Sequence, residues 1–382
     1  MVQRYLMNTI FDYIEWRGDI NMTHDPINDV DILILCRLSY IPFDNVVPSS
    51  IDEGSVQIKE AAIKVLELEN NGLKQFRKEE DKKLLEALID SERFKHIPLY
   101  YYVDIFSEES EEQFSAITMM LEDGTIAVIY RGTDGTLVGW KEDFNMSFSP
   151  EVPAQQDAIT YFTQVADCFP EKKLRLAGHS KGGNLAMYAA TFCRPDIQKR
   201  IIAVRNLDGP GFNEHQASKE DFSRISDVTL TYLPESSVIG MLLEHMEKSV
   251  IVSSQKIGLF QHNTYLWEIR RSGFVKKEEL SNSSRMIDKT LKNWLNNLSS
   301  KQREQMVDGL FQILSSTDGK TLRDLWNGKN VISILSAFMK MDEDTKSNIE
   351  TVMKLFQKSL KSNLSTKNMM EGFITEQSTI ER

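Results

Sequence analysis

The sequence has few cysteines and no long hydrophobic run. Its three cysteines, Cys36, Cys168 and Cys193, are far apart and odd in number, so we expect no disulfide framework and a reducing compartment. No run of about 18 apolar residues occurs, which argues against a transmembrane helix. Charged residues interrupt positions 1–18, which argues against a signal peptide. These absences predict a cytoplasmic protein.

An excess of basic residues is also missing. The 382-residue chain has 45 Lys and Arg against 56 Asp and Glu, a formal net charge of −11. Proteins that bind nucleic acids usually present a basic face, and an acidic surface is repelled by anionic lipid headgroups. His, Cys, Asp and Glu nowhere show the spacing of metal ligands. We therefore expect no nucleic acid, no metal and no other cofactor.

The chain has three successive regions that differ in polarity and in the spacing of their apolar residues. Residues 1–95 and 276–382 are largely polar, with apolar residues at helical spacing, whereas 96–275 alternates short apolar runs with turn signals and helical stretches. The runs that we predict as strands include residues 116–121, 125–131, 173–177, 201–207, 227–233 and 249–253. Strands alternating with helices predict a mostly parallel sheet covered on both faces. We expect an α/β core at 96–275, a helical N-terminal region at 1–95 that packs on it, and a helical C-terminal region or cap at 276–382.

A Gly-x-Ser-x-Gly motif, GHSKG at residues 178–182, carries the strongest functional signal. An apolar predicted strand precedes it, and a predicted helix at 182–193 follows it. A sharp strand-to-helix turn exposes the serine, its glycines allow close backbone approach, and the helix N-terminus directs free N–H groups at a reacting carbonyl. A plain glycine-rich turn is the alternative, whereas the residue order of a phosphate-binding loop is missing. The motif predicts Ser180 as the nucleophile of a serine hydrolase with the α/β-hydrolase fold.

A serine nucleophile needs a general base, and the chain has six histidines as candidates. The expected order in this fold is serine, acid, histidine, which disfavours the two histidines before the motif. Three further histidines are also less suitable as the base. His179 lies within the motif, where its side chain should point away from the serine. His215 fits a surface loop, and His245 falls in a predicted helix at 241–248. His262 lies in a turn after the last predicted strand, so we predict His262 as the base. A structural histidine in that turn is the alternative.

Motifs distributed from residue 12 to about residue 270 resemble one known group of proteins. They are DYIEWRGD at 12–19, RGTD at 131–134, GWKEDF at 139–144, GHSKGGNLA at 178–186, NLDGPGF at 206–212, SSVIGM at 236–241 and QHN at 261–263. These segments resemble the Mbeg-like bacterial proteins, a domain-of-unknown-function family within the class 3 lipase-like α/β-hydrolases. The resemblance implies the α/β-hydrolase fold and supports His262 as the base, and it carries over no established substrate.

An acyl-transfer site needs two N–H donors for the negative oxygen that forms in the transition state. The first is the N–H of the residue after the nucleophile, Lys181. In class 3 lipases the residue after an Arg-Gly pair supplies the second, so the resemblance implies Thr133 for this role. A tight turn stabilised by Asp134 and Gly135 is the alternative reading of the loop. Asp143 is a candidate for holding the loop through hydrogen bonds.

The acid that would orient His262 is the least determined part of the site. Class 3 lipases place an aspartate in the turn after the strand that here is residues 227–233, and the resemblance aligns that aspartate with Ser236. Glu235 is the adjacent carboxylate, and we predict Glu235 as the acid. Asp208, after the predicted strand at 201–207, is the alternative acid or part of a structural turn. A serine–histidine dyad without an acid is the third possibility.

These features predict a lipase-like or esterase-like serine hydrolase that cleaves a carboxylic ester through an acyl-enzyme. The expected partner is a small-molecule or lipid ester, and the terminal helices would cap the site and set the chain length. Two alternatives remain. One is a non-catalytic or regulatory protein of this fold with an incomplete triad, and the other is a thioesterase or peptidase.

Overall fold

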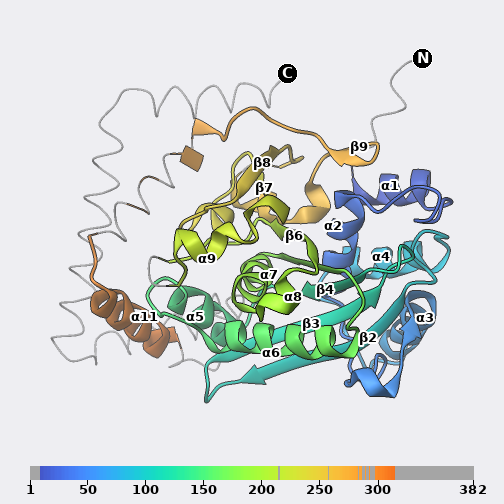
Figure 1. Cartoon of the computed structure of the whole chain (residues 1–382), viewed down its shortest axis with the longest axis horizontal. Helices are drawn as coiled ribbons and strands as arrows, with labels where there is room; N and C mark the ends of the chain where they lie inside the picture. The colour runs from blue at the N-terminus through green and yellow to red at the C-terminus, as the bar shows by residue number, and fades with distance from the viewer. Residues whose placement is uncertain are drawn as a thin grey trace.

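The computed structural model describes residues 9–213, 216–256, 258–282, 284, 285, 289, 292 and 297–314. A sheet of eight strands forms its centre, in the order β1-β2-β3-β4-β5-β6-β7-β8 (Figure 1). The strands are β1 (Val56–Gln57), β2 (Pro98–Ser107), β3 (Glu112–Met120), β4 (Ile126–Tyr130), β5 (Leu174–His179), β6 (Ile201–Leu207), β7 (Thr229–Pro234) and β8 (Lys248–Val252). Strands β1 to β4 pair antiparallel, and β4 to β8 pair parallel. The predicted α/β-hydrolase fold with a mostly parallel sheet is confirmed.

Helices precede, connect and follow these strands. The N-terminal helices are α1 (Ile10–Arg17), α2 (Asp29–Leu38), α3 (Ile58–Asn70) and α4 (Glu79–Ile89). The connecting helices are α5 (Leu137–Asn145), α6 (Pro153–Cys168), α7 (Lys181–Phe192), α8 (Pro195–Gln198) and α9 (Lys219–Ser223), and α11 (Ser300–Leu314) follows. Short 3₁₀ turns are η1 (Ile51–Glu53), η2 (Ser226–Val228), η3 (Ile239–Met241), η4 (Gly258–His262) and η5 (Thr264–Leu266), and β9 (Ile269–Arg270) pairs with β10 (Gly273–Phe274).

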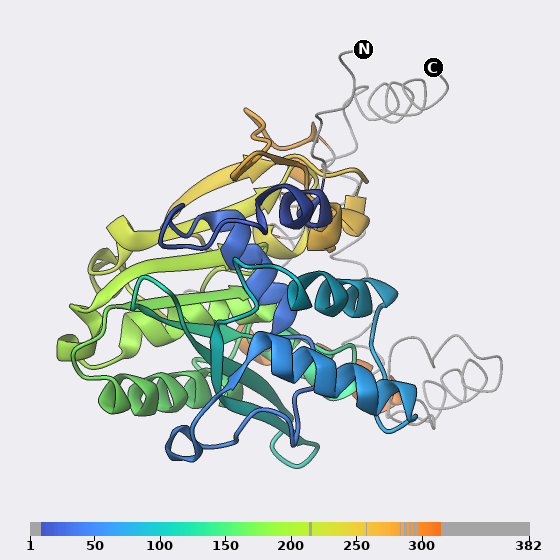
Figure 2. The ribbon, with the colours of Figure 1, turned by 90° about the vertical axis from the view of Figure 1, so that its right-hand side faces the viewer.

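Strand β4 shows how the sequence covers both faces of the sheet. All five of its residues are buried, and successive side chains of a strand point to opposite faces. Ala127 and Ile129 belong to a core shared with the N-terminal helices α1 to α4. Ile126, Val128 and Tyr130 belong to a second core, shared with α6 and α7. Figure 2 shows the N-terminal helices, in blue, across one face of the sheet.

Local sequence signals fix several element ends. Helix α1 begins at a capping box formed by Thr9 and Asp12, and α2 begins at one formed by Asn28 and Asp31; each box satisfies backbone N–H groups that the first helical turn leaves free. The turn between β3 and β4 closes with the Thr125 carbonyl accepting from the Leu121 N–H at 2.9 Å. Such ends depend on neighbouring residues, and the sequence reveals them.

The structure contradicts one predicted helix and contains another. The helix predicted at 241–248 is wrong, because Glu244 forms an antiparallel bridge with Phe212 and β8 begins at Lys248. Leu243 also has a positive φ of 65°, which interrupts a right-handed helix. In the C-terminal region, apolar residues at helical spacing predict helices at 284–298, 306–314 and 331–341. Helix α11 includes the second, whereas the third and most of the first lie outside the described residues. None of the described helices has the length and apolarity needed to cross a membrane.

Candidate active site

Ser180 lies in the tight turn between β5 and α7, as the motif predicts. Its backbone has φ 59° and ψ −135°, a strained conformation for a residue with a side chain. The Ser180 N–H donates to the Leu207 carbonyl at 3.0 Å, and its carbonyl accepts from the Gly183 N–H at 2.9 Å. A Cβ on Gly178 would lie 2.1 Å from the Gly182 carbonyl, so the turn has no room for a side chain there. The backbone geometry is that of a nucleophile elbow.

His262 ends the 3₁₀ turn η4, and its ring contacts Asp208. The distance between His262 Nδ1 and Asp208 Oδ2 is 2.7 Å, across 54 residues of sequence. Asp208 is buried, and its other carboxylate oxygen, Oδ1, accepts from the Ser237 hydroxyl at 2.5 Å. With Nδ1–H donating to the carboxylate, neutral His262 carries no proton on Nε2. This is the tautomer that a general base at Nε2 requires.

Of the two predicted acids, Asp208 contacts His262 and Glu235 does not. Glu235 forms an ion pair with Lys277 at 3.5 Å, and among the described residues no hydrogen bond or ion pair joins Glu235 to His262. The reason is the strand order. Strand β6 lies directly beside β5, so the residue after β6, Asp208, lies next to the elbow, whereas Glu235 follows β7, one strand farther away. A Cβ on the next residue, Gly209, would lie only 2.2 Å from the Ser180 carbonyl oxygen.

His179 has a place in the site that the sequence did not reveal. Its Nε2–H donates to the backbone carbonyl of His262 at 2.8 Å, and the Tyr40 hydroxyl donates to its Nδ1 at 2.8 Å. Burial and the neighbouring His262 hold the pKa of His179 well below its usual value, so the ring is neutral. His179 borders the same cavity as Ser180, and its contacts connect His262 to the N-terminal region through Tyr40.

The loop after β4 packs against the elbow. A Cβ on Gly132 would lie 2.5 Å from the His179 carbonyl oxygen and 2.9 Å from Ser180 Cβ, so glycine permits this close approach. The next residue, Thr133, donates from its hydroxyl to Asp143 Oδ2 at 2.5 Å. Asp143 therefore does hold the Thr133 loop. Burial raises the pKa of Asp143 to about 6, against the lowering effect of Lys181.

Lys181 contributes both its backbone and a buried side chain. It is the first residue of α7, so its N–H has no partner within the helix. The ammonium group donates to Glu142 Oε2 and to the Gln113 carbonyl, each at 2.6 Å. Glu142 is buried and also accepts from the Gln113 and Ala154 N–H groups. These contacts fix the start of α7 against β3 and α5. Thr133 and Lys181 both border the cavity beside Ser180.

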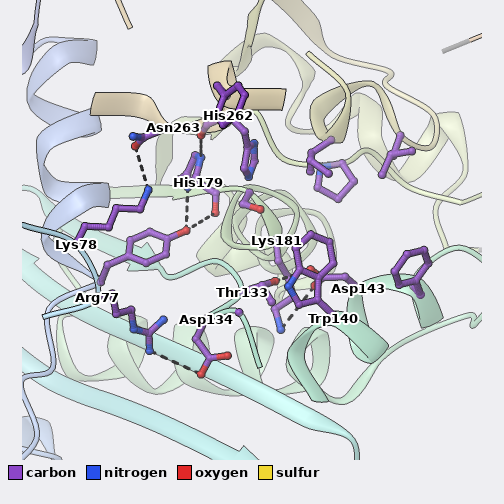
Figure 3. Close-up of a pocket in the computed structure, with 18 of the residues that line it drawn as sticks. Arg77, Lys78, Thr133, Asp134, Trp140, Asp143, His179, Lys181, His262 and Asn263 are labelled. Carbon is purple, nitrogen blue, oxygen red and sulfur yellow. Dashed lines mark hydrogen bonds and ion pairs between the residues drawn. The ribbon is translucent and has the colours of Figure 1, made fainter. Parts of the chain in front are cut away.

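A cavity of about 690 Å³ opens next to Ser180 and His262. Its wall includes Trp140 and Phe144 from α5 and Met306 from α11, which packs on α5. Residues from α2, α4 and the segments beside them complete the opposite wall (Figure 3). In the part of the chain that the structure describes, Ser180 Oγ forms no hydrogen bond, although both it and the His262 ring border this cavity. The N-terminal and C-terminal additions therefore both contribute to the wall of the cavity.

Comparisons with known proteins agree with the motifs in the sequence. No curated protein matches the chain. The chain is similar to a Rhizomucor miehei lipase in its propeptide complex (14% identity, TM-score 0.32, covering 45% of this chain and 59% of that one), so it spans less than two thirds of that protein. It is also similar to a Yarrowia lipolytica lipase (10% identity, TM-score 0.34, 50% and 84% covered) and a Rhizopus microsporus lipase (16% identity, TM-score 0.33, 65% and 87% covered). The Mbeg1-like family model matches residues 88–312, more than half of the sequence. The chain belongs to the Mbeg1-like family.

Proposed function

We propose that this protein is a serine hydrolase that cleaves carboxylic esters through an acyl-enzyme. One observation carries the proposal: a serine in the strained turn of a nucleophile elbow borders the same cavity as a histidine whose Nδ1 contacts a buried aspartate. A base oriented in this way is what a serine hydroxyl needs to become a nucleophile. The buried position of Asp208 also keeps water from competing for the Nδ1–H.

The reaction begins when Ser180 Oγ attacks the ester carbonyl carbon and His262 Nε2 takes the hydroxyl proton. The N–H groups of Lys181 and Thr133 stabilise the oxyanion, while Asp208 stabilises the imidazolium that forms. When the tetrahedral intermediate collapses, the C–O bond breaks and His262 protonates the leaving alcohol. A water molecule, activated by His262, then releases the acid from Ser180.

The absence of a hydrogen bond between Ser180 and His262 in the described structure is compatible with this role. Hydrogen bonds between catalytic groups are often long without substrate and shorten in the Michaelis complex. The Asp208 contact orients the His262 ring, the His179 contact holds its backbone carbonyl, and both His262 and Ser180 border the cavity in which a substrate would bind.

A fluorophosphonate probe tests the proposal directly, because it forms a covalent bond only with an activated serine. We expect stoichiometric labelling of the protein, with the modified peptide containing Ser180, and turnover of p-nitrophenyl esters. Ser180→Ala should abolish both, whereas Ser223→Ala, at an exposed serine on α9, should change neither. An unlabelled wild-type protein that turns over no ester would contradict the proposal.

Ser236 occupies the position that the resemblance assigns to the acid, which favours an incomplete triad. The contact between His262 and Asp208, a carboxylate from the neighbouring strand, supports a complete triad instead. A thioesterase would use the same residues, and matched oxygen esters and thioesters of one acyl chain distinguish the two reactions. We expect the oxygen ester to be hydrolysed.

A further inference from the structure

The cavity beside Ser180 has two ends of different chemistry. One end is apolar, formed by Trp140 of α5, Leu242 after η3 and Met306 of α11. The other end has three cationic side chains, Arg37, Arg77 and Lys78. Figure 3 shows Arg77 and Lys78 on one side of His179, and Trp140 on the other. An ester bound at Ser180 would therefore extend towards an apolar wall in one direction and towards cations in the other.

The three cations differ in how completely they are neutralised. Arg37 is buried, pairs with Asp81 at 2.8 Å and lies over the ring of Tyr40. Arg77 has a distant carboxylate, Asp134, at 3.7 Å. The ammonium group of Lys78 contacts the neutral side-chain oxygen of Asn263 at 3.2 Å. Within the described part of the chain, no carboxylate pairs with Lys78.

This end of the cavity has three cations against the two carboxylates of Asp81 and Asp134, in a protein whose net charge is −11. Lys78 and Arg77 both keep part of their surface exposed, but partial desolvation in the cavity and the charge of Arg37 lower the pKa of Lys78, and partial desolvation and the charge of Arg131 lower the pKa of Arg77. Both directions mean that the surroundings disfavour the charged forms. An anion placed between these side chains would relieve that repulsion, and the guanidinium and ammonium groups are the usual donors to phosphate.

We propose that the cationic end of the cavity binds a phosphate group, so that the substrates are acyl esters of phosphate-bearing alcohols. This inference rests on the proposed hydrolase function and specifies its substrate class. The acyl chain would lie along the apolar end, and the phosphate-bearing alcohol would extend towards Lys78 and Arg77. Hydrolysis breaks the acyl C–O bond, adds one water, and yields a carboxylic acid and a phosphorylated alcohol. The phosphate itself stays unchanged and serves only for binding.

Two ether ligands test the phosphate site without any reaction. The probes are 1-O-decylglycerol and 1-O-decylglycerol 3-phosphate, bound below their micellar concentrations to the full chain in a calorimeter. We expect the phosphate-bearing ether to bind about tenfold more tightly or better, a difference of about 1.4 kcal/mol, with the advantage decreasing at high salt. Equal binding of the two ethers would overturn the proposal, whatever the protein hydrolyses.

Substitution of Lys78 tests whether the cationic end of the cavity causes the preference for the phosphate-bearing ether. Lys78→Met should reduce the affinity ratio of the two ethers about tenfold, as expected for one partly desolvated ion pair. The matched control is Lys83→Met on the same region of α4, because that side chain is exposed, pairs with Glu79 and lies outside the cavity wall. It should leave the ratio unchanged. A ratio unaffected by Lys78→Met would also overturn the proposal.

Hydrolysis of the corresponding decanoyl esters then connects binding to turnover. We expect kcat/KM to favour 1-decanoylglycerol 3-phosphate over 1-decanoylglycerol, and Lys78→Met to reduce this preference through a higher KM for the phosphate ester. Turnover of both esters at equal efficiency would contradict the substrate class and leave the hydrolase function intact. Phosphate-dependent ether binding without labelling of Ser180 would instead contradict the hydrolase function, and with it the substrate class, and leave the phosphate site intact.

Discussion

The nucleophile side and the histidine side of the candidate site are built in different ways. Ser180 belongs to one continuous segment, in which β5, the turn and α7 follow each other directly. His262 depends on segments that are distant in sequence. Asp208, after β6, and His179, at the end of β5, contact it directly, and Ser237, after β7, holds Asp208. Backbone geometry therefore determines the first side, and hydrogen bonds between loops determine the second. Substitutions on the nucleophile side should damage folding, whereas those on the histidine side should damage activity in a folded protein.

The largest expected effect on catalysis comes from Asp208, and it distinguishes this residue from Glu235 as the acid that orients His262. Asp208→Asn keeps the shape of the side chain, and asparagine also tolerates the positive φ of 53° at this position. The variant loses the charge that stabilises the imidazolium, so kcat/KM for an ester should fall by about 10³-fold or more. Glu235→Gln should leave kcat/KM within about twofold, because the side chain pairs with Lys277 away from the site. Steady-state kinetics of both variants would reverse our assignment if Glu235→Gln were the more damaging.

The nucleophile side is tested by adding one methyl group to the elbow. Gly178→Ala places a Cβ 2.1 Å from the Gly182 backbone, so the turn must distort at a cost of about 3 kcal/mol or more. Urea unfolding should show this loss of stability. Gly273→Ala is the matched control, because a Cβ there meets no atom within 4 Å. A Gly178→Ala protein as stable as wild type would show that the elbow is less constrained than its contacts imply.

A smaller effect is expected from the contact that connects the two sides through His179. Tyr40→Phe removes the hydroxyl that donates to His179 Nδ1. This buried nitrogen then lacks that hydrogen bond, and the His179 ring, which donates to the His262 carbonyl, is held less firmly. We expect kcat to fall about tenfold, equivalent to about 1.4 kcal/mol, with little change in KM. Tyr100→Phe, on β2, serves as the control. A change confined to stability, with kcat intact, would make Tyr40 structural only.

The smallest predicted effect concerns pH and the Thr133 loop. Because the pKa of folded Asp143 is raised to about 6, the folded protein binds a proton there more tightly than the unfolded chain. The stability from this group is complete below about pH 4 and decreases as the pH rises through about 6. Asp143→Asn lacks this titration, so between pH 5.5 and pH 7.5 the variant should gain about 1 kcal/mol in unfolding free energy relative to wild type. Urea unfolding at the two pH values measures the change, and a gain in the opposite direction would contradict the assignment.

Local patterns predicted much of the fold. The continuous apolar run of β4 and the turn around Asp123 are encoded in adjacent residues, and both appear in the structure. The helix predicted at 241–248 failed because a long-range bridge between Phe212 and Glu244 holds that segment extended. Apolar spacing alone does not reveal such a partner.

The candidate site shows the same division between local sequence patterns and long-range contacts. The sequence by itself determined the elbow, since the strand, the glycines and the helix that place Ser180 are consecutive, and short-range sterics leave that turn few alternatives. Only the tertiary structure decided that Asp208 rather than Glu235 contacts His262, and that His179 holds the His262 backbone. The physical reason is that these contacts depend on β6 lying beside β5 and on the return of η4 to the elbow, over separations of 54 and 83 residues. The order of strands in a sheet is a property of the whole packed core, and no local pattern of residues specifies it.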